Sequence, residues 1–205
     1  MEISLENIGR RFNRDWIFRG INYTFRAGKS YAILGRNGSG KSTLLQLIAG
    51  SLSPSEGKIE VRFKEKLYDA DDVYQLISLA APYLELIEEF TLAEMIDFHF
   101  KFKSYQNGLN KASLIDLLEL GPSKNKALKY FSSGMKQRTK LALAICSETP
   151  IVLLDEPASN LDSQAITWYQ DLIKEYTVNR TVIICSNQEN EYYFCENHLQ
   201  LSDFK

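Results

Sequence analysis

The residues best suited to chemistry form a glycine-rich run, Gly-Arg-Asn-Gly-Ser-Gly-Lys-Ser, at positions 35–42. Its spacing matches the pattern G-x4-G-K-[ST], in which glycines let backbone N–H groups turn toward phosphate oxygens. Lys41 is placed to reach the β and γ phosphates of a nucleotide, and Ser42 to bind Mg²⁺. This run, named the P-loop below, predicts binding of ATP or GTP. The predicted phosphate-binding residues are Gly35, Asn37, Gly38, Ser39, Gly40, Lys41, Ser42 and Thr43.

The segments on either side of the P-loop are the ones that position such a loop. Residues 31–34, Tyr-Ala-Ile-Leu, form a short apolar run typical of a buried strand, and residues 43–50 predict a helix that ends at Gly50. The N-terminus of that helix would bring its positive dipole end to the phosphates. The alternative is a glycine-rich turn without a ligand, which the flanking strand and helix disfavour.

Two acids follow a second apolar run, Ile-Val-Leu-Leu at residues 151–154. The carboxyl ends of parallel strands meet ligands at one edge of a sheet, so Asp155 and Glu156 are predicted to lie beside the nucleotide. Asp155 would hold Mg²⁺ through water, and Glu156 would orient and polarise the attacking water. A strand followed by an acidic turn is the alternative, but the P-loop in the same chain favours the nucleotide interpretation.

Composition indicates a soluble, globular protein. The 205 residues are 44% hydrophobic and 24% charged, and the net charge of -2 argues against a nucleic-acid partner. Cys146, Cys185 and Cys195 lack metal-site or disulfide spacing, so we expect buried thiols in a reducing compartment. Residues 1–4 show no basic stretch that leads into an apolar block, and no segment approaches the roughly 18 apolar residues needed to span a bilayer. We therefore expect a cytosolic protein or one peripheral to a membrane.

Hydrophobic periodicity divides the chain into segments. Polar and apolar residues alternate within 1–30 and 57–63, which predicts an antiparallel β layer. Residues 92–131 change to a helical period and form a predicted insertion. The rest favours a parallel α/β sheet. Its predicted elements are a strand at 76–80, a helix at 134–148, a strand at 151–154, a helix at 163–177, and strands at 181–185 and 198–201.

Three further stretches carry a family resemblance. Phe-Ser-Ser-Gly-Met at residues 131–135 is similar to a signature motif usually written LSGGQ, and it keeps the serine and second glycine as Ser132 and Gly134. Residues 159–162, Ser-Asn-Leu-Asp, resemble the D-loop that follows the acidic pair. Phe12, with Trp16 as the alternative, stands where an aromatic ring stacks on adenine. With the P-loop, these stretches make the whole chain resemble the ATP-binding cassette (ABC) ATPases, the motor subunits of ABC transporters.

The resemblance implies an α/β fold: a P-loop NTPase core with a parallel sheet, an antiparallel β subdomain and a helical insertion. A single ABC domain would span 1–205, with the core at 1–82 and 134–205 and the helical subdomain at 83–133. It also implies a head-to-tail dimer, in which the P-loop of one subunit and Ser132 and Gly134 of the other enclose ATP and Mg²⁺. The implied contacts include Phe12 on adenine, Asp162 of the D-loop, and Ser42 and Asp155 on the metal.

The sequence departs from the family at two positions. The family usually has a histidine after the strand at 181–185, and this chain has Asn187, whose amide donates a hydrogen bond but carries no charge. Where the family usually has a metal-contacting glutamine, this chain has Pro82, which offers no side-chain ligand. We therefore expect retained nucleotide binding with slower hydrolysis, Asn187 being the catalytic-site residue in the histidine position. Residues 83–90 would belong to the groove that receives a permease helix, or would merely pack the insertion.

The resemblance favours the ATPase subunit of a transporter, on the cytoplasmic face of the cell membrane. Its partners would be a separate transmembrane permease and a second ABC ATPase subunit, identical or different. The chain ends soon after the last predicted strand, without the C-terminal regulatory domain of many importer ATPases, and this favours an exporter. Alternatives are a catalytically weakened regulatory subunit, which Asn187 and Pro82 favour, and a soluble non-transport ABC ATPase. The latter usually carries coiled-coil arms or two cassettes.

Overall fold

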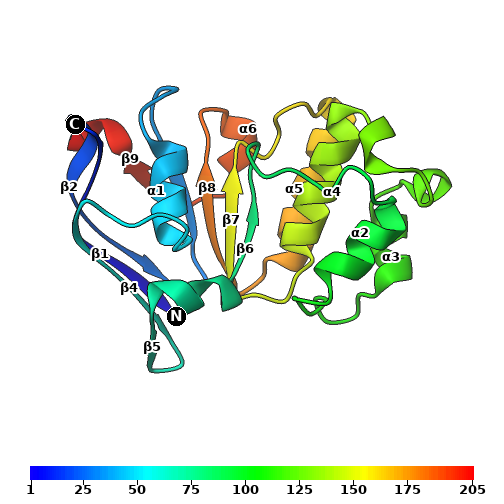
Figure 1. Ribbon diagram of the computed structural model, residues 1–205, viewed down its shortest axis with the longest axis horizontal. Coiled ribbons are helices and arrows are strands. Elements are labelled where there is room, and N and C mark those ends of the chain that lie inside the picture. Colours follow the sequence, from blue (N-terminus) through cyan, green and yellow to red (C-terminus); the bar gives the residue numbers. More distant parts are fainter. The chain divides into compact units, whose positions relative to one another are not determined.

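A computed structural model describes residues 1–205 (Figure 1). The chain forms two compact units. The first, named the sheet unit, comprises Met1–Leu79, Thr149–Asp155 and Asn179–Lys205. The second, named the helical unit, comprises Ala80–Glu148 and Glu156–Val178. The division that the family resemblance implies, with a helical subdomain at 83–133, rests on motif positions and not on packing, and it stays a prediction.

The sheet unit contains the predicted antiparallel layer. Its strand order is β2-β1-β4-β5, and the long hairpin of β1 and β2 pairs Phe12 with Asp15 at its tip. Ile3 and Leu5 are buried on alternate positions, and a register shift between Leu5 and Ile8 keeps Ile8 on the buried face as well. The strands are β1 (Glu2–Phe12), β2 (Asp15–Arg26), β4 (Glu56–Phe63) and β5 (Lys66–Tyr68).

A five-stranded sheet in order β6-β7-β8-β3-β9 forms the rest of this unit (Figure 1). The pairs β7/β8, β3/β8 and β3/β9 are parallel, which confirms the predicted parallel sheet. All residues of β7 and β8 are buried, because a central strand has a covered surface on both faces. The elements are β3 (Ser30–Leu34), α1 (Lys41–Ile48), β6 (Ile77–Ala80), β7 (Ile151–Asp155), β8 (Thr181–Cys185), α6 (Glu189–Tyr192) and β9 (Asn197–Gln200).

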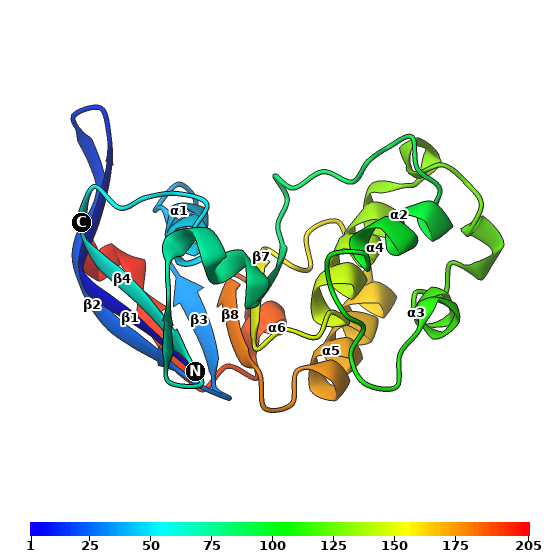
Figure 2. The same cartoon turned by 60° about the horizontal axis from the view of Figure 1, so that its bottom comes forward.

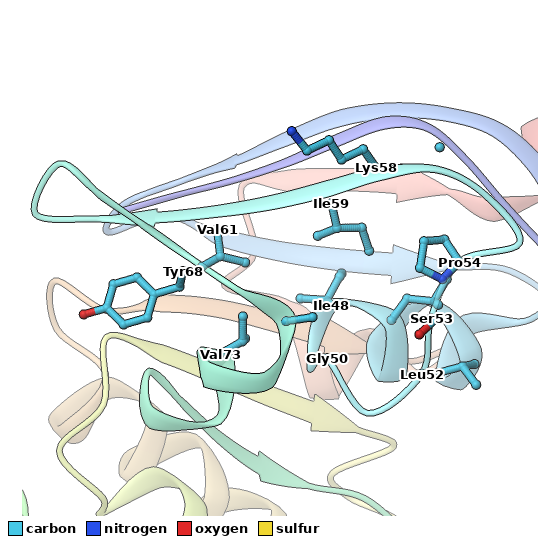
Figure 3. Close-up of a pocket in the computed structure, with 13 residues that line it drawn as sticks. Ile48, Gly50, Leu52, Ser53, Pro54, Lys58, Ile59, Val61, Tyr68 and Val73 are labelled. Carbon is cyan, nitrogen blue, oxygen red and sulfur yellow. The ribbon is translucent and has the colours of Figure 1, made fainter.

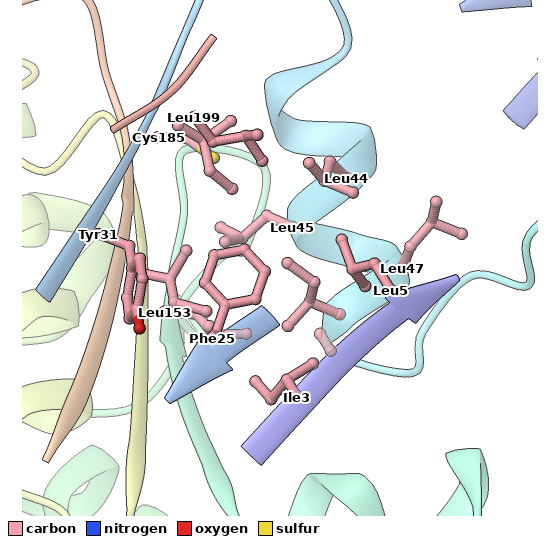
Figure 4. Packing of buried hydrophobic residues seen from close by; sticks show 14 of the residues in the cluster. Ile3, Leu5, Phe25, Tyr31, Leu44, Leu45, Leu47, Leu153, Cys185 and Leu199 are labelled. Carbon is pink, nitrogen blue, oxygen red and sulfur yellow. The ribbon is translucent and has the colours of Figure 1, made fainter. Parts of the chain in front are cut away.

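One hydrophobic core joins the two sheets and α1 (Figure 4). Leu44 and Leu45 of α1 pack into it, and Ile3 and Leu5 enter it from β1. The rings of Phe25 and Tyr31 meet edge to face, with centroids 4.9 Å apart. This packing fixes α1, and with it the loop that precedes α1. Cys146, Cys185 and Cys195 are all buried free thiols, as predicted.

The sheet unit also holds a pocket and a buried polar network away from the P-loop. The pocket, about 200 Å³ in volume, lies between α1, β4 and residues 70–75, and apolar side chains such as Ile48, Ile59 and Val73 line it (Figure 3). In the network, the buried guanidinium of Arg180 donates to the Thr149 carbonyl at 2.7 Å, and Thr149 Oγ1 lies 2.9 Å from Ser78 Oγ. None of the predicted site residues belongs to either feature.

The helical unit consists of α2 (Leu92–His99), α3 (Lys111–Leu117), α4 (Ser133–Ile145) and α5 (Ser163–Tyr176) (Figure 2). A capping box starts α2, where Thr91 and Glu94 exchange hydrogen bonds, and Asn110 caps α3. The helix predicted from Leu92 ends at His99, so Phe102 lies beyond it with 72% of its surface exposed. No helix of the chain combines the length and the apolar character that crossing a membrane requires.

Candidate nucleotide-binding site

The P-loop connects β3 to α1, as the sequence predicts. Gly40 adopts φ +101°, and a Cβ at this position would lie 2.3 Å from Cγ2 of Ile17 on β2. The loop backbone therefore lies directly against the antiparallel layer, and only glycine fits both the backbone angle and the space. Ser39 is 4% exposed, its hydroxyl has no hydrogen-bond partner, and Gly35 lies beside it. The loop thus holds a buried polar group that a bound phosphate could satisfy.

Lys41 folds back over its own loop. Its Nζ donates to the carbonyl of Gly35 at 2.7 Å and lies 3.4 Å from that of Arg36. A phosphate oxygen is a charged acceptor and makes a stronger bond to an ammonium than a neutral carbonyl does. The lysine is therefore positioned to exchange these carbonyls for phosphate.

The strand register brings Asp155 to the same sheet edge as the P-loop. Asp155 pairs with Cys185 in β8, and Cys185 pairs with Ile33 at the end of β3. Cys185 Sγ also donates to the Lys41 carbonyl at 3.4 Å. Asp155 is 2% exposed, and Ser42 lies in the first turn of α1. A carboxylate and a hydroxyl are oxygen ligands of the kind that Mg²⁺ takes together with water and phosphates, so this donor set fits the ion.

Asn187, the residue in the histidine position, lies at this edge too. It follows β8, and its Nδ2 donates to Oδ1 of Asn37 in the P-loop at 2.7 Å. The two histidines lie elsewhere: His99 bonds Ser147 in the helical unit, and His198 lies 3.1 Å from the Cys195 carbonyl. Burial lowers the pKa of His99 to about 4, aided by the nearby Lys103 charge, so its ring is neutral at pH 7. Neither histidine takes part in the predicted site.

Phe12 and Trp16, the two candidates for stacking on adenine, differ in exposure. Phe12 is 47% exposed at the tip of the β1/β2 hairpin, and the Arg10 guanidinium lies 4.6 Å from its ring centroid. Trp16 is partly buried, and Arg19 and Arg11 lie over its ring at 4.2 and 5.5 Å. Phe12 therefore offers more free ring surface to a base.

The acidic turn after β7 leads into the helical unit. Glu156 is half-buried and adopts φ +45°, a conformation uncommon for a residue with a side chain. Its carbonyl accepts from Ser159 N–H at 3.1 Å, and the Pro157 carbonyl accepts from the buried Gln137 amide at 2.8 Å. A hydrogen bond from Gln137 of α4 thus stabilises the turn that carries Glu156. Such strained residues concentrate at functional sites.

The signature and D-loop residues come together in the helical unit. Ser132 caps α4, since its Oγ accepts from Met135 N–H at 3.2 Å, and Asp162 caps α5 through Ala165 N–H at 2.8 Å. A Cβ on Gly134 would lie 3.1 Å from the Asn160 carbonyl, so the D-loop packs closely on the start of α4. Both caps are structural, and they leave the predicted nucleotide contacts as predictions. A cleft of about 230 Å³ lies here, lined by Glu119, Ser132, Gly134, Met135, Arg138, Asn160, Leu161, Asp162, Gln164 and Ala165.

The segment after β6 is tied to the signature helix by two lysines. Pro82 is exposed, and its carbonyl accepts from Lys140 Nζ at 3.3 Å. Lys136, four residues earlier on α4, forms an ion pair with Glu88. Burial lowers the pKa of Lys140, while Glu85 opposes that change. These contacts were not predicted from the sequence. Two lysines spaced i, i+4 on a predicted helix, together with an acidic segment, could have indicated them.

Known proteins of one family are similar to this chain in sequence. A sequence model of the family described as "ABC transporter" matches residues 18–159, more than half of the chain. The chain belongs to the ABC transporter family. The Bacillus subtilis protein YybJ, named an uncharacterized ABC transporter ATP-binding protein, is 27% identical over 202 residues, which are 98% of this chain and 92% of YybJ. The cytochrome c biogenesis ATP-binding export protein CcmA of Agrobacterium fabrum is 28% identical, over 100% of this chain and 97% of CcmA.

Solved structures agree on the ABC fold. The dimeric ATP-binding cassette MJ0796, in a post-hydrolysis state with ADP and Pi, matches with a TM-score of 0.80 at 24% identity. The match covers 97% of this chain and 93% of that one. It confirms the predicted fold class, a P-loop ABC ATPase with a parallel sheet, an antiparallel sheet and helices. This ABC chain is an ATP-binding subunit.

Proposed function

We propose that this chain hydrolyses ATP with Mg²⁺ as the motor subunit of an ABC exporter. The observation that carries the proposal is the strand register, which aligns Asp155 of β7 with the strand that leads into the P-loop. Purified protein should release phosphate from ATP, and EDTA should stop the release. Undetectable turnover with intact ATP binding would favour the regulatory subunit instead.

Each site residue has a role in this reaction. Lys41 and the P-loop N–H groups would bind the β and γ phosphates, and Ser42 and Asp155 would hold Mg²⁺. Held there, Mg²⁺ would supply positive charge to offset the negative charge of the phosphates. Glu156 orients the attacking water and accepts its proton. Little covalent chemistry is required of the protein, because phosphoryl transfer depends chiefly on positioning and charge stabilisation.

A second ABC subunit would complete the site. We infer that Ser132 and Gly134 of one subunit face the γ phosphate held by the P-loop of the other, with Asp162 near the contact. The N-terminus of α4 would there supply N–H donors and a favourable dipole. The dimeric state of the structural relative MJ0796 supports this arrangement. A single subunit should hydrolyse ATP poorly.

A membrane permease is the proposed partner, which would couple ATP hydrolysis by this chain to transport. Residues 83–90 contain exposed apolar side chains, with Tyr83 at 42% and Leu84 at 39%, suited to receiving a permease helix. Export is supported by the similarity to CcmA, an export protein that this chain matches along 97% of its length. Affinity purification from detergent-extracted membranes should recover a permease. Recovery of the chain without any permease would count against the transport function.

The Asn187→His variant tests the histidine position. We expect turnover to rise about five- to tenfold with ATP affinity unchanged, because a hydrogen bond from a charged donor is worth about 1 kcal/mol more than one from a neutral amide. Steady-state ATPase assays would measure this, with Asn187→Ala as the control that should lower the rate. An unchanged or lower rate in Asn187→His would show that asparagine is adequate here.

The Phe12→Ala variant tests adenine stacking. We expect ATP affinity to fall about 10- to 100-fold, since stacking of a base on an aromatic ring contributes about 1–3 kcal/mol. Calorimetry with ATP measures the change, and thermal unfolding should shift little because Phe12 is half-exposed. Trp16→Ala is the matched control. If Trp16→Ala weakens binding and Phe12→Ala does not, Trp16 is the stacking residue.

A further inference from the structure

A buried carboxylate, Glu191, lies outside the residues assigned above. It belongs to α6 and is 0% exposed. Its Oε2 accepts a hydrogen bond from the hydroxyl of Ser186, which is also 0% exposed. Burying a carboxylate is costly unless hydrogen bonds compensate, so its place beside Ser186 invites a functional explanation.

Ser186, which directly precedes Asn187, is held in place by hydrogen bonds. Its backbone N–H donates to the Ile33 carbonyl of β3 at 3.3 Å, and its Oγ accepts from Gln188 N–H at 2.8 Å. Glu191 N–H in turn donates to the Gln188 carbonyl at 3.0 Å. Hydrogen bonds therefore hold the residues before and after Asn187, and the buried Glu191 bonds to both of them.

Asn187 itself has no such burial. Its side chain is exposed and contacts the P-loop through Asn37 Oδ1 at 2.7 Å, and Asn37 is exposed as well. A hydrogen bond between two neutral amides in contact with water stabilises one position only weakly. The position of Asn187 over the P-loop must then come mostly from the turn that carries it.

We propose that Glu191 is a positioning residue for ATP hydrolysis: through Ser186 it fixes the turn that carries Asn187 and so holds the Asn187 amide at Asn37 of the P-loop. This inference rests on the proposed ATPase function. A displacement of about 1 Å in a catalytic constellation can cost about a hundredfold in rate, whereas ATP binding depends mainly on the P-loop backbone and Lys41. Loss of the Glu191 carboxylate should therefore act on turnover more than on affinity.

The test compares Ser186→Ala and Glu191→Leu, which removes the carboxylate acceptor at similar size, with the parent protein. We expect kcat to fall about tenfold or more in both, with KM for ATP within about twofold. Ser78→Ala is the matched control, because it removes a buried hydrogen bond of the same unit at Thr149. It should lower the midpoint of thermal unfolding without lowering kcat. Equal losses of kcat in Ser78→Ala would overturn the proposal.

A double-mutant cycle separates positioning from general destabilisation. If Glu191 acts through Asn187, Glu191→Leu should lower kcat no further once Asn187→Ala is present. An undiminished effect in that background would overturn the proposal.

A readout without turnover keeps the proposal distinct from the ATPase function. The side-chain amide resonances of Asn187, assigned by their loss in Asn187→Ala, should shift in nucleotide-free Glu191→Leu and stay in place in Ser78→Ala. Absent ATP hydrolysis with these shifts present would refute the proposed function alone. Unshifted resonances in both Glu191→Leu and Ser186→Ala would refute the role of Glu191.

Discussion

The Glu156→Gln variant should hydrolyse ATP at least about a hundredfold more slowly than the parent protein while still binding it, because removal of a general base typically costs about 10²- to 10⁴-fold. Glutamine keeps the shape of the side chain but cannot accept a proton from water. A phosphate-release assay measures the rate. Since ATP persists in this variant, size-exclusion chromatography with ATP and Mg²⁺ should reveal a dimer that the parent forms only transiently.

Two results would contradict this assignment. A rate above about a tenth of the parent's would mean that another group orients the water. Loss of ATP binding in calorimetry would mean that the substitution disturbed the turn at Pro157 and Gln137 rather than the reaction. Glu148→Gln is the control, because Glu148 is exposed and should tolerate the same chemical change with full activity.

The Lys41→Met variant should bind ATP about 10- to 150-fold more weakly, because hydrogen bonds to charged groups contribute about 1.5–3 kcal/mol. Methionine keeps the apolar stem of the side chain, which matters because Lys41 is only 6% exposed. Isothermal titration calorimetry with ATP and Mg²⁺ gives the affinity directly. Turnover should be lost as well, since the same ammonium stabilises the transferring phosphate.

Lys174→Met provides the control for this change. Lys174 is exposed in the last turn of α5, so the substitution removes one positive charge without touching the P-loop. ATP affinity should then match that of the parent. If Lys41→Met also bound ATP like the parent, the P-loop would not grip the phosphates through this lysine, and the nucleotide interpretation of the loop would be wrong.

Much of the fold was predictable because local pattern and tertiary structure agree. The strand, P-loop and helix around Lys41, and the buried strand before Asp155, follow from runs of apolar residues that end at glycine or acids. Sequence did not predict β5 or α6, which are only 3 and 4 residues long and carry no period. Phe102 falls within the stretch 92–131 that was predicted to be helical, but it lies beyond the end of α2 and is exposed, because periodicity does not show where a helix ends.

The candidate site divides in the same way. Motif spacing predicted the places of the P-loop and Asp155, since parallel strands deliver their carboxyl ends to one edge, and the family resemblance indicated Asn187. The contacts that hold these residues were not predictable: Asn187 with Asn37 joins residues 150 positions apart, and Ser186 with Glu191 depends on how a four-residue helix folds back. Such contacts depend on side-chain directions that only the assembled structure sets.

Lys136 and Lys140 connect α4 to the segment that follows β6. Lys136, in the first turn of α4, pairs with Glu88, and Lys140, near the middle of the helix, donates to the Pro82 carbonyl. Residues 82–88 are therefore connected to α4 at two positions about one turn apart along the helix. The Lys136–Glu88 ion pair is exposed to solvent and weakens in salt, so we expect the connection of residues 82–88 to α4 to loosen at high ionic strength before ATP binding weakens.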